Sequence, residues 1–255
     1  MEAEEEKIVE HAKEAVHALT DRKKSWSKKI GSFLWEILVI VIAVNLTIWF
    51  HNWNDKRHEQ AQVKNFLIDT RESLIQDTVS IRKYINYMTN NQLVYYDSVL
   101  SQINRNKIDA QYIDAYFYQL TGNYGMEIDY STYQSFSSAN NLRLVENRKL
   151  LRDIVSLYSN KFSTLQSNFQ LLYEKRFDGF DKYIAIKTGY NNNFTKLSTI
   201  IHQPEVINII QMGDIIIKEV NEQCERVINQ TATVIQEIDK ELKNKFNVTV
   251  ETKKA

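Results

Sequence analysis

The side chains of this chain that carry reactive chemistry are few and far apart in the sequence. No histidine stands in an HExxH motif or at the spacing of a Cys/His metal site, and the P-loop, GxGxxG and GxSxG motifs are missing. His51 and His58 share one helical face, which is more typical of a wet interfacial helix than of a metal site. We therefore predict that the protein is not an enzyme and has no catalytic residue, no metal ligand and no cofactor.

Charge and cysteine content exclude further classes of protein. The 32 basic residues balance the 32 acidic ones, so no overall basic field attracts nucleic acid. Cys224 is the only cysteine, which excludes an intramolecular disulfide and leaves a free thiol or an intermolecular bridge. Positive charge is concentrated in one cluster just before a long apolar segment, a juxtamembrane arrangement that predicts contact with the anionic lipids of an inner leaflet. This basic cluster consists of Arg22, Lys23, Lys24, Lys28 and Lys29.

The one long apolar segment follows this cluster at residues 33–50, FLWEILVIVIAVNLTIWF. Its 18 residues extend roughly 27 Å as a helix, close to the ~30 Å hydrocarbon thickness of a bilayer. Trp35, Trp49 and Trp53 have rings suited to the headgroup layer, so we predict that they are interfacial anchors. A cleaved signal peptide is the alternative, but its apolar core has only ~7–15 residues and is followed by a small-residue cleavage site, which is missing here.

The flanking charges set the predicted orientation of this segment. No acid lies between Asp21 and Glu36, whereas residues 55–59 mix both signs. The positive-inside rule then predicts a single-pass protein of a bacterial inner membrane, with a cytoplasmic N-terminus and a periplasmic C-terminal domain. The predicted regions are a cytoplasmic amphipathic tail with the basic cluster at 1–29, a transmembrane helix at 30–54, a periplasmic helical bundle at 55–248 and a disordered C-terminal tail at 249–255.

Glu36 is the only acid inside the apolar segment. An acid at the centre of a span costs about 2.5–3.5 kcal/mol on insertion scales, and less near an interface. In helical projection it lies in line with Ser32, Ala43 and Thr47, and a small and polar stripe of this kind lets membrane helices approach and hydrogen-bond one another. We predict a helix contact on this face. Two alternatives stay open: Glu36 reaches the headgroups beside the basic cluster, or it joins a proton or ion path that a partner completes.

The remaining composition predicts long helices. The chain has only six glycines and one proline, and apolar residues recur after the span at spacings of three, four or seven. This seam predicts a near-continuous helix over 31–104, with a hinge near 52–55 as the alternative; further long helices are expected at 147–187 and 204–245. The predicted fold is all-α: a single N-terminal transmembrane helix that continues into an elongated antiparallel periplasmic helical bundle. The seam consists of Val63, Leu67, Thr70, Leu74, Ile81, Ile85 and Met88.

Aromatic residues are dense around a TGNYG turn at 121–125. Most of these rings are expected to fill the end of the bundle with their hydroxyls at its surface. The functional alternative is a recognition patch at the far tip for a peptide, a glycan or a partner loop. Its candidate residues are Tyr116, Tyr118, Tyr124, Tyr130 and Tyr133.

Two blocks of the sequence resemble an uncharacterised family of bacterial membrane proteins, domain of unknown function 6090, found mainly in Bacteroidota. The first is EILVIVIAVNLTIWFHNWND at 36–55, where Glu36, Ile37 and the Asn-Trp-Asn at 52–54 match and Ala43 departs from the usual glycine. The second is TYQSFSSANNLRLVENRKLLRDIVSLYS at 132–159. The resemblance covers roughly residues 30–245 in order. It implies a bacterial, single-span topology and supplies no activity.

These observations predict a non-enzymatic, membrane-anchored scaffold or interaction protein that is a homo-oligomer or a subunit of a complex with another membrane protein. One alternative is a periplasmic sensor or receptor that relays to a cytoplasmic partner through the amphipathic residues 3–20. The other is an accessory subunit of a transport or energy-coupling complex that uses Glu36.

Overall fold

The computed structural model describes the backbone of residues 2–121, 124–188 and 196–249. Within these ranges it describes side chains from Phe33 onward, except at residue 121 and at several positions of 171–185. Every secondary-structure element in the described residues is a helix, and none of them forms a strand. The prediction of an all-α fold is therefore confirmed. The chain divides into two compact units, Met1–Gln60 and Ala61–Ala255.

Helix α1 (Glu2–Tyr87) is the longest element, with 86 residues. It runs without a break through residues 52–55, where a hinge was the alternative. Gly31, the expected start of the long helix, lies inside α1, because one glycine in a helix interior costs only about 1 kcal/mol relative to alanine. The tail helix and the apolar segment therefore belong to one element.

A π-helical turn, η1 (Met88–Leu93), joins α1 to α2 (Val94–Asn104). The helix predicted to extend to residue 104 is thus present, with one change of hydrogen-bond register. Such a turn rotates the side chains that follow it relative to those before it. The buried face continues through Gln92, Tyr95 and Val99, so one polar and two apolar side chains lie on the inner side.

A second π-helical turn interrupts the helix predicted at 147–187. Asn147 begins this region, because its side-chain oxygen accepts the backbone N–H of Leu150 at 3.2 Å and caps the helix. The predicted single helix consists in fact of α6 (Arg148–Ser156), η3 (Leu157–Phe162) and α7 (Ser163–Thr188). The other elements are α3 (Ala110–Ala115), α4 (Tyr118–Thr121), α5 (Ser131–Ser138), η2 (Asn141–Leu144), α8 (Leu197–Ile200) and α9 (Pro204–Phe246).

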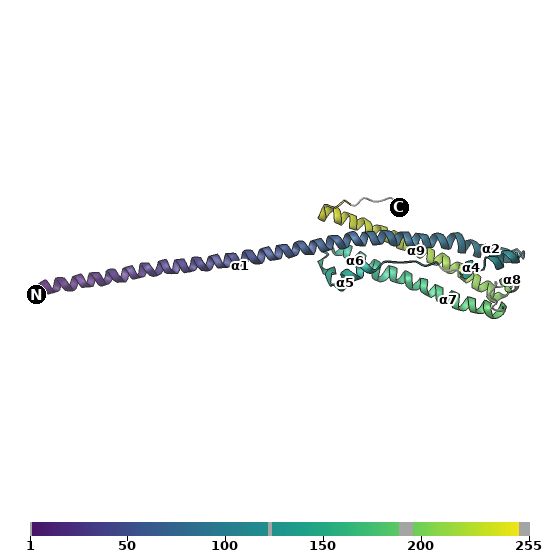
Figure 1. Cartoon of the computed structure of the whole chain (residues 1–255), viewed down its shortest axis with the longest axis horizontal. Helices are drawn as coiled ribbons and strands as arrows, with labels where there is room; N and C mark the ends of the chain where they lie inside the picture. The colour runs from purple at the N-terminus through teal and green to yellow at the C-terminus, as the bar shows by residue number, and fades with distance from the viewer. Residues whose placement is uncertain (1, 122–123, 189–195, 250–255) are drawn as a thin grey trace. The chain divides into compact units, whose positions relative to one another are not determined.

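The core of the second unit forms along the predicted seam. Six of its seven residues are buried and Ile85 is partly buried, so the pattern marks the inward face correctly. Helix α9 packs against α2 and against α7, and Figure 1 shows α9 between the ribbons of these two helices. Fully buried residues of α9 include Ile210, Ile217, Cys224, Thr231, Ile238 and Leu242.

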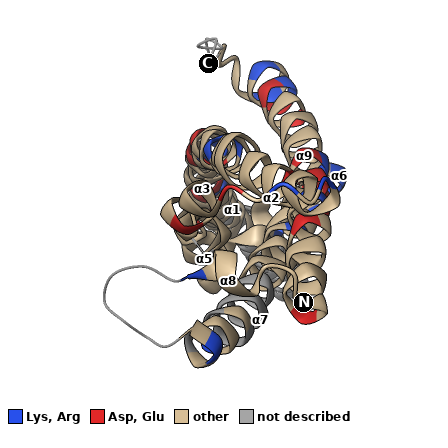
Figure 2. Cartoon of the chain, turned by 90° about the vertical axis from the view of Figure 1, so that its right-hand side faces the viewer, with Lys and Arg blue, Asp and Glu red and all other residues tan. Residues whose placement is uncertain are grey.

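Polar pairs fix how α9 lies against α1 and α2. The Arg71 guanidinium donates to the Asp239 carboxylate at 2.5 Å. Further along, Asn221 donates to Thr89 at 3.2 Å, and Lys218 lies 3.6 Å from Asp97. Residue numbers therefore fall on α9 as they rise on α1 and α2. Figure 2 shows basic and acidic residues together along the α9 ribbon.

Gly213 of α9 provides a test of this packing. A Cβ atom at this position would lie 2.6 Å from Cε1 and 2.8 Å from Oη of Tyr96. The Tyr96 ring is buried and its hydroxyl donates to the Leu120 carbonyl at 3.2 Å, so the ring has little room to move. We predict that Gly213→Ala lowers the free energy of unfolding by about 1–3 kcal/mol, although alanine is the better helix former.

Denaturant unfolding followed by circular dichroism measures this change. Gly125→Ala is the matched control, because no atom lies within 4 Å of a Cβ at that position. Its stability is expected to change by less than about 0.5 kcal/mol. Equal stability of both variants would contradict the close contact between Gly213 and Tyr96.

Candidate functional site

One helix in the described part of the chain is long and apolar enough to cross a membrane, judged by length and composition. It contains the predicted apolar segment, and every residue from 33 to 59 is exposed. Trp35 and Trp49, the predicted anchors near its ends, are 65% and 64% exposed. An apolar surface of this extent is unfavourable in water, which makes this helix a candidate for contact with lipid or with another protein.

The polar residues of this helix are satisfied locally. The Thr47 hydroxyl donates to the Ala43 carbonyl at 2.8 Å, and the Asn45 amide on the opposite face donates to the Val41 carbonyl at 2.7 Å. These bonds lower the cost of placing both side chains in hydrocarbon. Glu36 is exposed on the same face as Ala43 and Thr47. The side chains of the other predicted residues on this side, Ser32 and the basic cluster, lie outside the described residues.

The far end of the span carries interacting aromatic and polar groups. The Phe50 and Trp53 rings are 5.7 Å apart, and the Arg57 guanidinium lies 4.9 Å from the centre of the Trp53 ring. His51 Nε2 lies 3.3 Å from Asp55 Oδ2. An aromatic ring beside a cation and a polar pair suits the transition from hydrocarbon to water.

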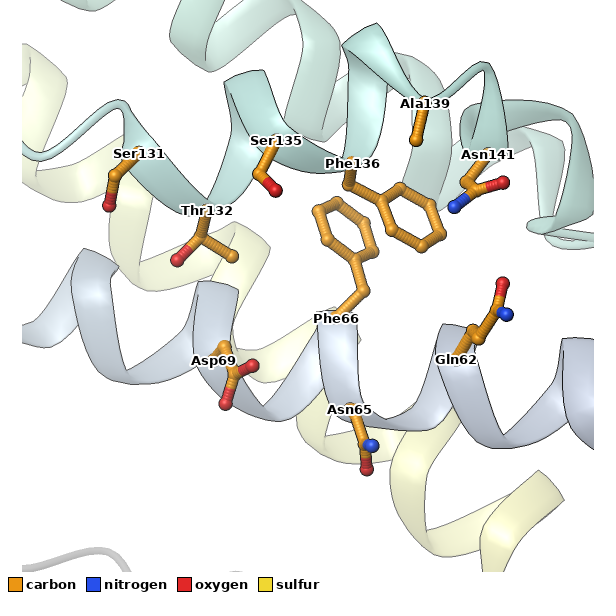
Figure 3. Close-up of a pocket in the computed structure, with 10 residues that line it drawn as sticks. All are labelled: Gln62, Asn65, Phe66, Asp69, Ser131, Thr132, Ser135, Phe136, Ala139 and Asn141. Carbon is orange, nitrogen blue, oxygen red and sulfur yellow. The ribbon is translucent and has the colours of Figure 1, made fainter.

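The second unit contains a groove of about 580 Å³ between α1 and the α5 region, shown in Figure 3. At its centre the rings of Phe66 and Phe136 stack, with centroids 3.9 Å apart and an interplanar angle of 7°. The polar residues that line it are Gln62, Asn65, Asp69, Ser131, Thr132, Ser135 and Asn141.

The lining of this groove sets the chemistry that it can offer. Its polar groups are amides, hydroxyls and the single carboxylate of Asp69, and no lysine, arginine or histidine lines it. Such a surface hydrogen-bonds neutral groups and has no cation to balance an anion. The stacked rings give it an apolar floor.

Hydrogen bonds attach the segment before α5 to α1 next to the groove. Ser80 accepts the backbone N–H of Glu127 at 3.1 Å, and Asp77 Oδ1 accepts that of Asp129 at 2.9 Å. Ser73 completes the row, with its hydroxyl 3.4 Å from Asp129 Oδ2 and 3.5 Å from the Thr132 hydroxyl. The position of α5, and with it one wall of the groove, depends on these contacts.

Two of the tyrosines predicted at a recognition patch pack on Tyr158 of η3. The Tyr133 ring stacks on it at 4.9 Å with an interplanar angle of 4°, and the Tyr130 ring meets it edge-on at 5.9 Å. Tyr158 is buried, so these contacts belong to the core. The expectation that the rings fill the bundle describes this pair, but the Tyr130 hydroxyl is buried and does not lie at the surface as expected.

The other three predicted tyrosines lie in separate contacts. Tyr124 stacks on Tyr87 with centroids 4.8 Å apart. Tyr116 and Tyr118 are 6.3 Å apart and 45% and 54% exposed. The structure therefore distributes the five rings over three places, and a recognition role stays a prediction. Residues 122–123 of the TGNYG turn lie outside the described residues.

The sequence interpretation did not find the groove or the burial of Asp77. One signal for Asp77 was present: in the heptad spacing of Leu67, Thr70, Leu74 and Ile81, residue 77 occupies a core position. A carboxylate at such a position is buried against the fold. The groove had no signal, because its two walls lie about seventy residues apart in the chain.

Comparison of the chain with protein-family models, with curated proteins and with solved structures gives no match. The resemblance to domain of unknown function 6090 stays a prediction. Among the described residues, no three histidine, cysteine, aspartate or glutamate side chains gather at a common point. The candidate surfaces are therefore the exposed apolar helix and the groove.

Cys224 lies in the core of α9, and burial, aided by the charge of Glu225, raises its pKa to about 12. Because the thiolate is the reactive form, we predict that the native protein reacts with maleimide at pH 7.5 roughly 10³-fold more slowly than an exposed thiol does. Mass spectrometry of timed samples measures the rate. Gln230→Cys, on an exposed position of the same helix, is the fast-reacting control. Rapid labelling of native wild-type protein would show that the α9 core opens readily.

Proposed function

We propose that this protein is a non-enzymatic scaffold or interaction protein of a bacterial inner membrane. In this proposal the exposed apolar helix anchors the chain, and the second unit is an elongated antiparallel periplasmic helical bundle that oligomerises or holds a partner. The observation that carries the proposal is the continuity of α1, which contains both the exposed span at 33–50 and the buried seam of the second unit.

The span supports association as well as anchoring. Lipid covers an apolar helix without selecting a face, whereas Glu36, Ala43 and Thr47 make one face small and polar. Thr47 already donates to Ala43, so a second helix can approach this face without leaving that hydroxyl proton unpaired. Carboxylate and hydroxyl oxygens on one side are groups that a facing helix can hydrogen-bond.

The orientation rests on the flanks of the span. The basic cluster at 22–29 favours the cytoplasmic side, and the Phe50, Trp53 and Arg57 contacts suit the opposite headgroup layer. Membership of the domain of unknown function 6090 family fits the same topology and is part of this proposal.

A sensor is the second candidate, and the unbroken helix from Glu2 to Tyr87 favours it. A helix without a hinge transmits a shift or rotation from one end to the other. In this alternative a ligand or partner of the second unit moves α1, and the amphipathic residues 3–20 present that motion to a cytoplasmic protein. Deletion of residues 2–20 would then abolish the response, and would leave oligomerisation intact.

Disulfide cross-linking in native membranes tests the association face. We predict that Ala43→Cys gives a covalent dimer, or a cross-link to a partner, after mild oxidation. Val41→Cys is the matched control, because it lies about 160° around the helix from Ala43. The wild-type Cys224 is buried, so its contribution to the cross-linked band is expected to be negligible.

Two results together would overturn the scaffold proposal. If neither variant cross-links and gentle purification returns the single chain without any other protein, the anchor serves only to hold a monomer. Equal cross-linking of both variants would support oligomerisation but contradict the prediction that the helices meet at the face of Ala43.

A labelling experiment tests the topology. We predict that a membrane-impermeant maleimide labels Gln230→Cys once the outer membrane is permeabilised and while the inner membrane is intact. Residue 230 is exposed on α9, and wild-type protein gives the background from Cys224. Labelling only after lysis of the inner membrane would place the second unit in the cytoplasm and contradict the periplasmic scaffold and sensor proposals together.

A further inference from the structure

Asp77 is a carboxylate at the buried contact between α1 and the segment before α5. Its side chain is 2% exposed, and its Oδ1 atom accepts the backbone N–H of Asp129 at 2.9 Å. Its other oxygen, Oδ2, is buried and has no hydrogen-bond partner. A buried ionised carboxylate with one satisfied oxygen is costly, since it has lost its water without gaining a counter-charge.

The Asp129 carboxylate makes the negative charge of Asp77 more costly. Asp129 and Tyr130 face it from the segment before α5, and Tyr158 faces it from η3. The hydroxyls of Tyr130 and Tyr158 are themselves buried without a partner. In the described part of the chain, no lysine, arginine or histidine forms an ion pair with Asp77. The cluster thus has a repelling carboxylate and no compensating cation.

These surroundings raise the pKa of Asp77 to about 7. Burial is the main cause; the hydrogen bond from the Asp129 backbone opposes it, and the Asp129 charge adds to it. A neutral Asp77 keeps the bond to Asp129 through Oδ1 and removes the negative charge from the buried, unpartnered Oδ2. The protonated form therefore fits the site better than the ionised form.

We propose that Asp77 is a proton-dependent latch that holds the segment 126–141 on α1 in its neutral form and loosens that segment when it ionises. The segment forms one wall of the groove, so ionisation of Asp77 also opens the groove between α1 and α5. This device is independent of the membrane anchor and of the scaffold function proposed above.

The direction of the pH effect follows from the shift. The closed state holds the Asp77 proton up to about pH 7, whereas an opened, solvated Asp77 loses it near its ordinary value of 3.8. Between these values the open state binds fewer protons, so the free energy of opening falls as pH rises from about 4 to about 7. Above pH 7 Asp77 is ionised in both states and contributes no further change.

Hydrogen–deuterium exchange of the full-length protein in detergent, at pH 5 and pH 8, tests the latch. After correction for the intrinsic exchange rate, the exchange rate of peptides within 126–141 should increase roughly 10- to 100-fold from pH 5 to pH 8. This increase reports more frequent opening of the segment. Asp77→Asn, which imitates the neutral acid, should reduce this increase to less than about threefold. Peptides of α9 report the folded state of each protein and should behave alike in both.

A second variant separates the latch from a general effect of charge. Glu72→Gln removes an exposed acid one turn earlier on α1 and should retain the full wild-type pH dependence. The latch is wrong if Asp77→Asn keeps the wild-type increase while its α9 peptides remain protected. It is equally wrong if the wild-type protein shows no increase. Cross-linking of the span is not expected to change in either variant, so the two proposals fail separately.

Discussion

One unbroken helix that carries two kinds of surface constrains this chain more than any other feature. Within hydrocarbon a lone segment must satisfy its own peptide groups, which only a helix can do. Because α1 continues without a break, the same helix must also present a core seam beyond residue 61. Its sequence changes accordingly, from residues exposed on all sides at 33–50 to a stripe buried on one side from Val63 onward. The α-helical backbone is constant, and only the pattern of exposed and buried side chains changes.

Polar groups inside the second unit give that seam its register. Arg71 is 6% exposed and reaches Asp239 of α9, so a shift of one helix along the other would leave a buried guanidinium unpaired. Thr231 avoids the same cost by donating to its own helix, at the Val227 carbonyl. Asp77 is not fully hydrogen-bonded in this way, because only its Oδ1 atom has a hydrogen-bond partner. Among these three buried polar residues, Asp77 is the one whose cost of burial depends on whether it is protonated.

The sequence predicted what depends on local periodicity. The seam from Val63 to Met88 and the apolar residues of α9 have the spacing of a buried helical face, and both are buried. The π-helical turns η1 and η3 were not predictable, because a change of hydrogen-bond register arises from packing between helices rather than from residue preference. The groove was missed for a related reason: Phe66 and Phe136 stack across a distance in the chain that no periodic pattern connects. The heptad spacing places the charged Asp77 at a core position of the seam, but it does not identify the residues that contact Asp77.

The charged residues of the second unit are largely used in contacts within that unit. Several ion pairs of the second unit join one helix to another: Arg71 to Asp239, Lys149 to Glu237 and Lys218 to Asp97. Lys245 and Glu146 add a fourth link, at 2.9 Å. These charges stabilise contacts within the unit and are less available to an outside partner. The side chains of residues 33–50 are not used in this way, because all of them are exposed and none is buried against another part of the described chain. Apolar surface that the fold leaves uncovered is the surface most available for contacts outside the chain.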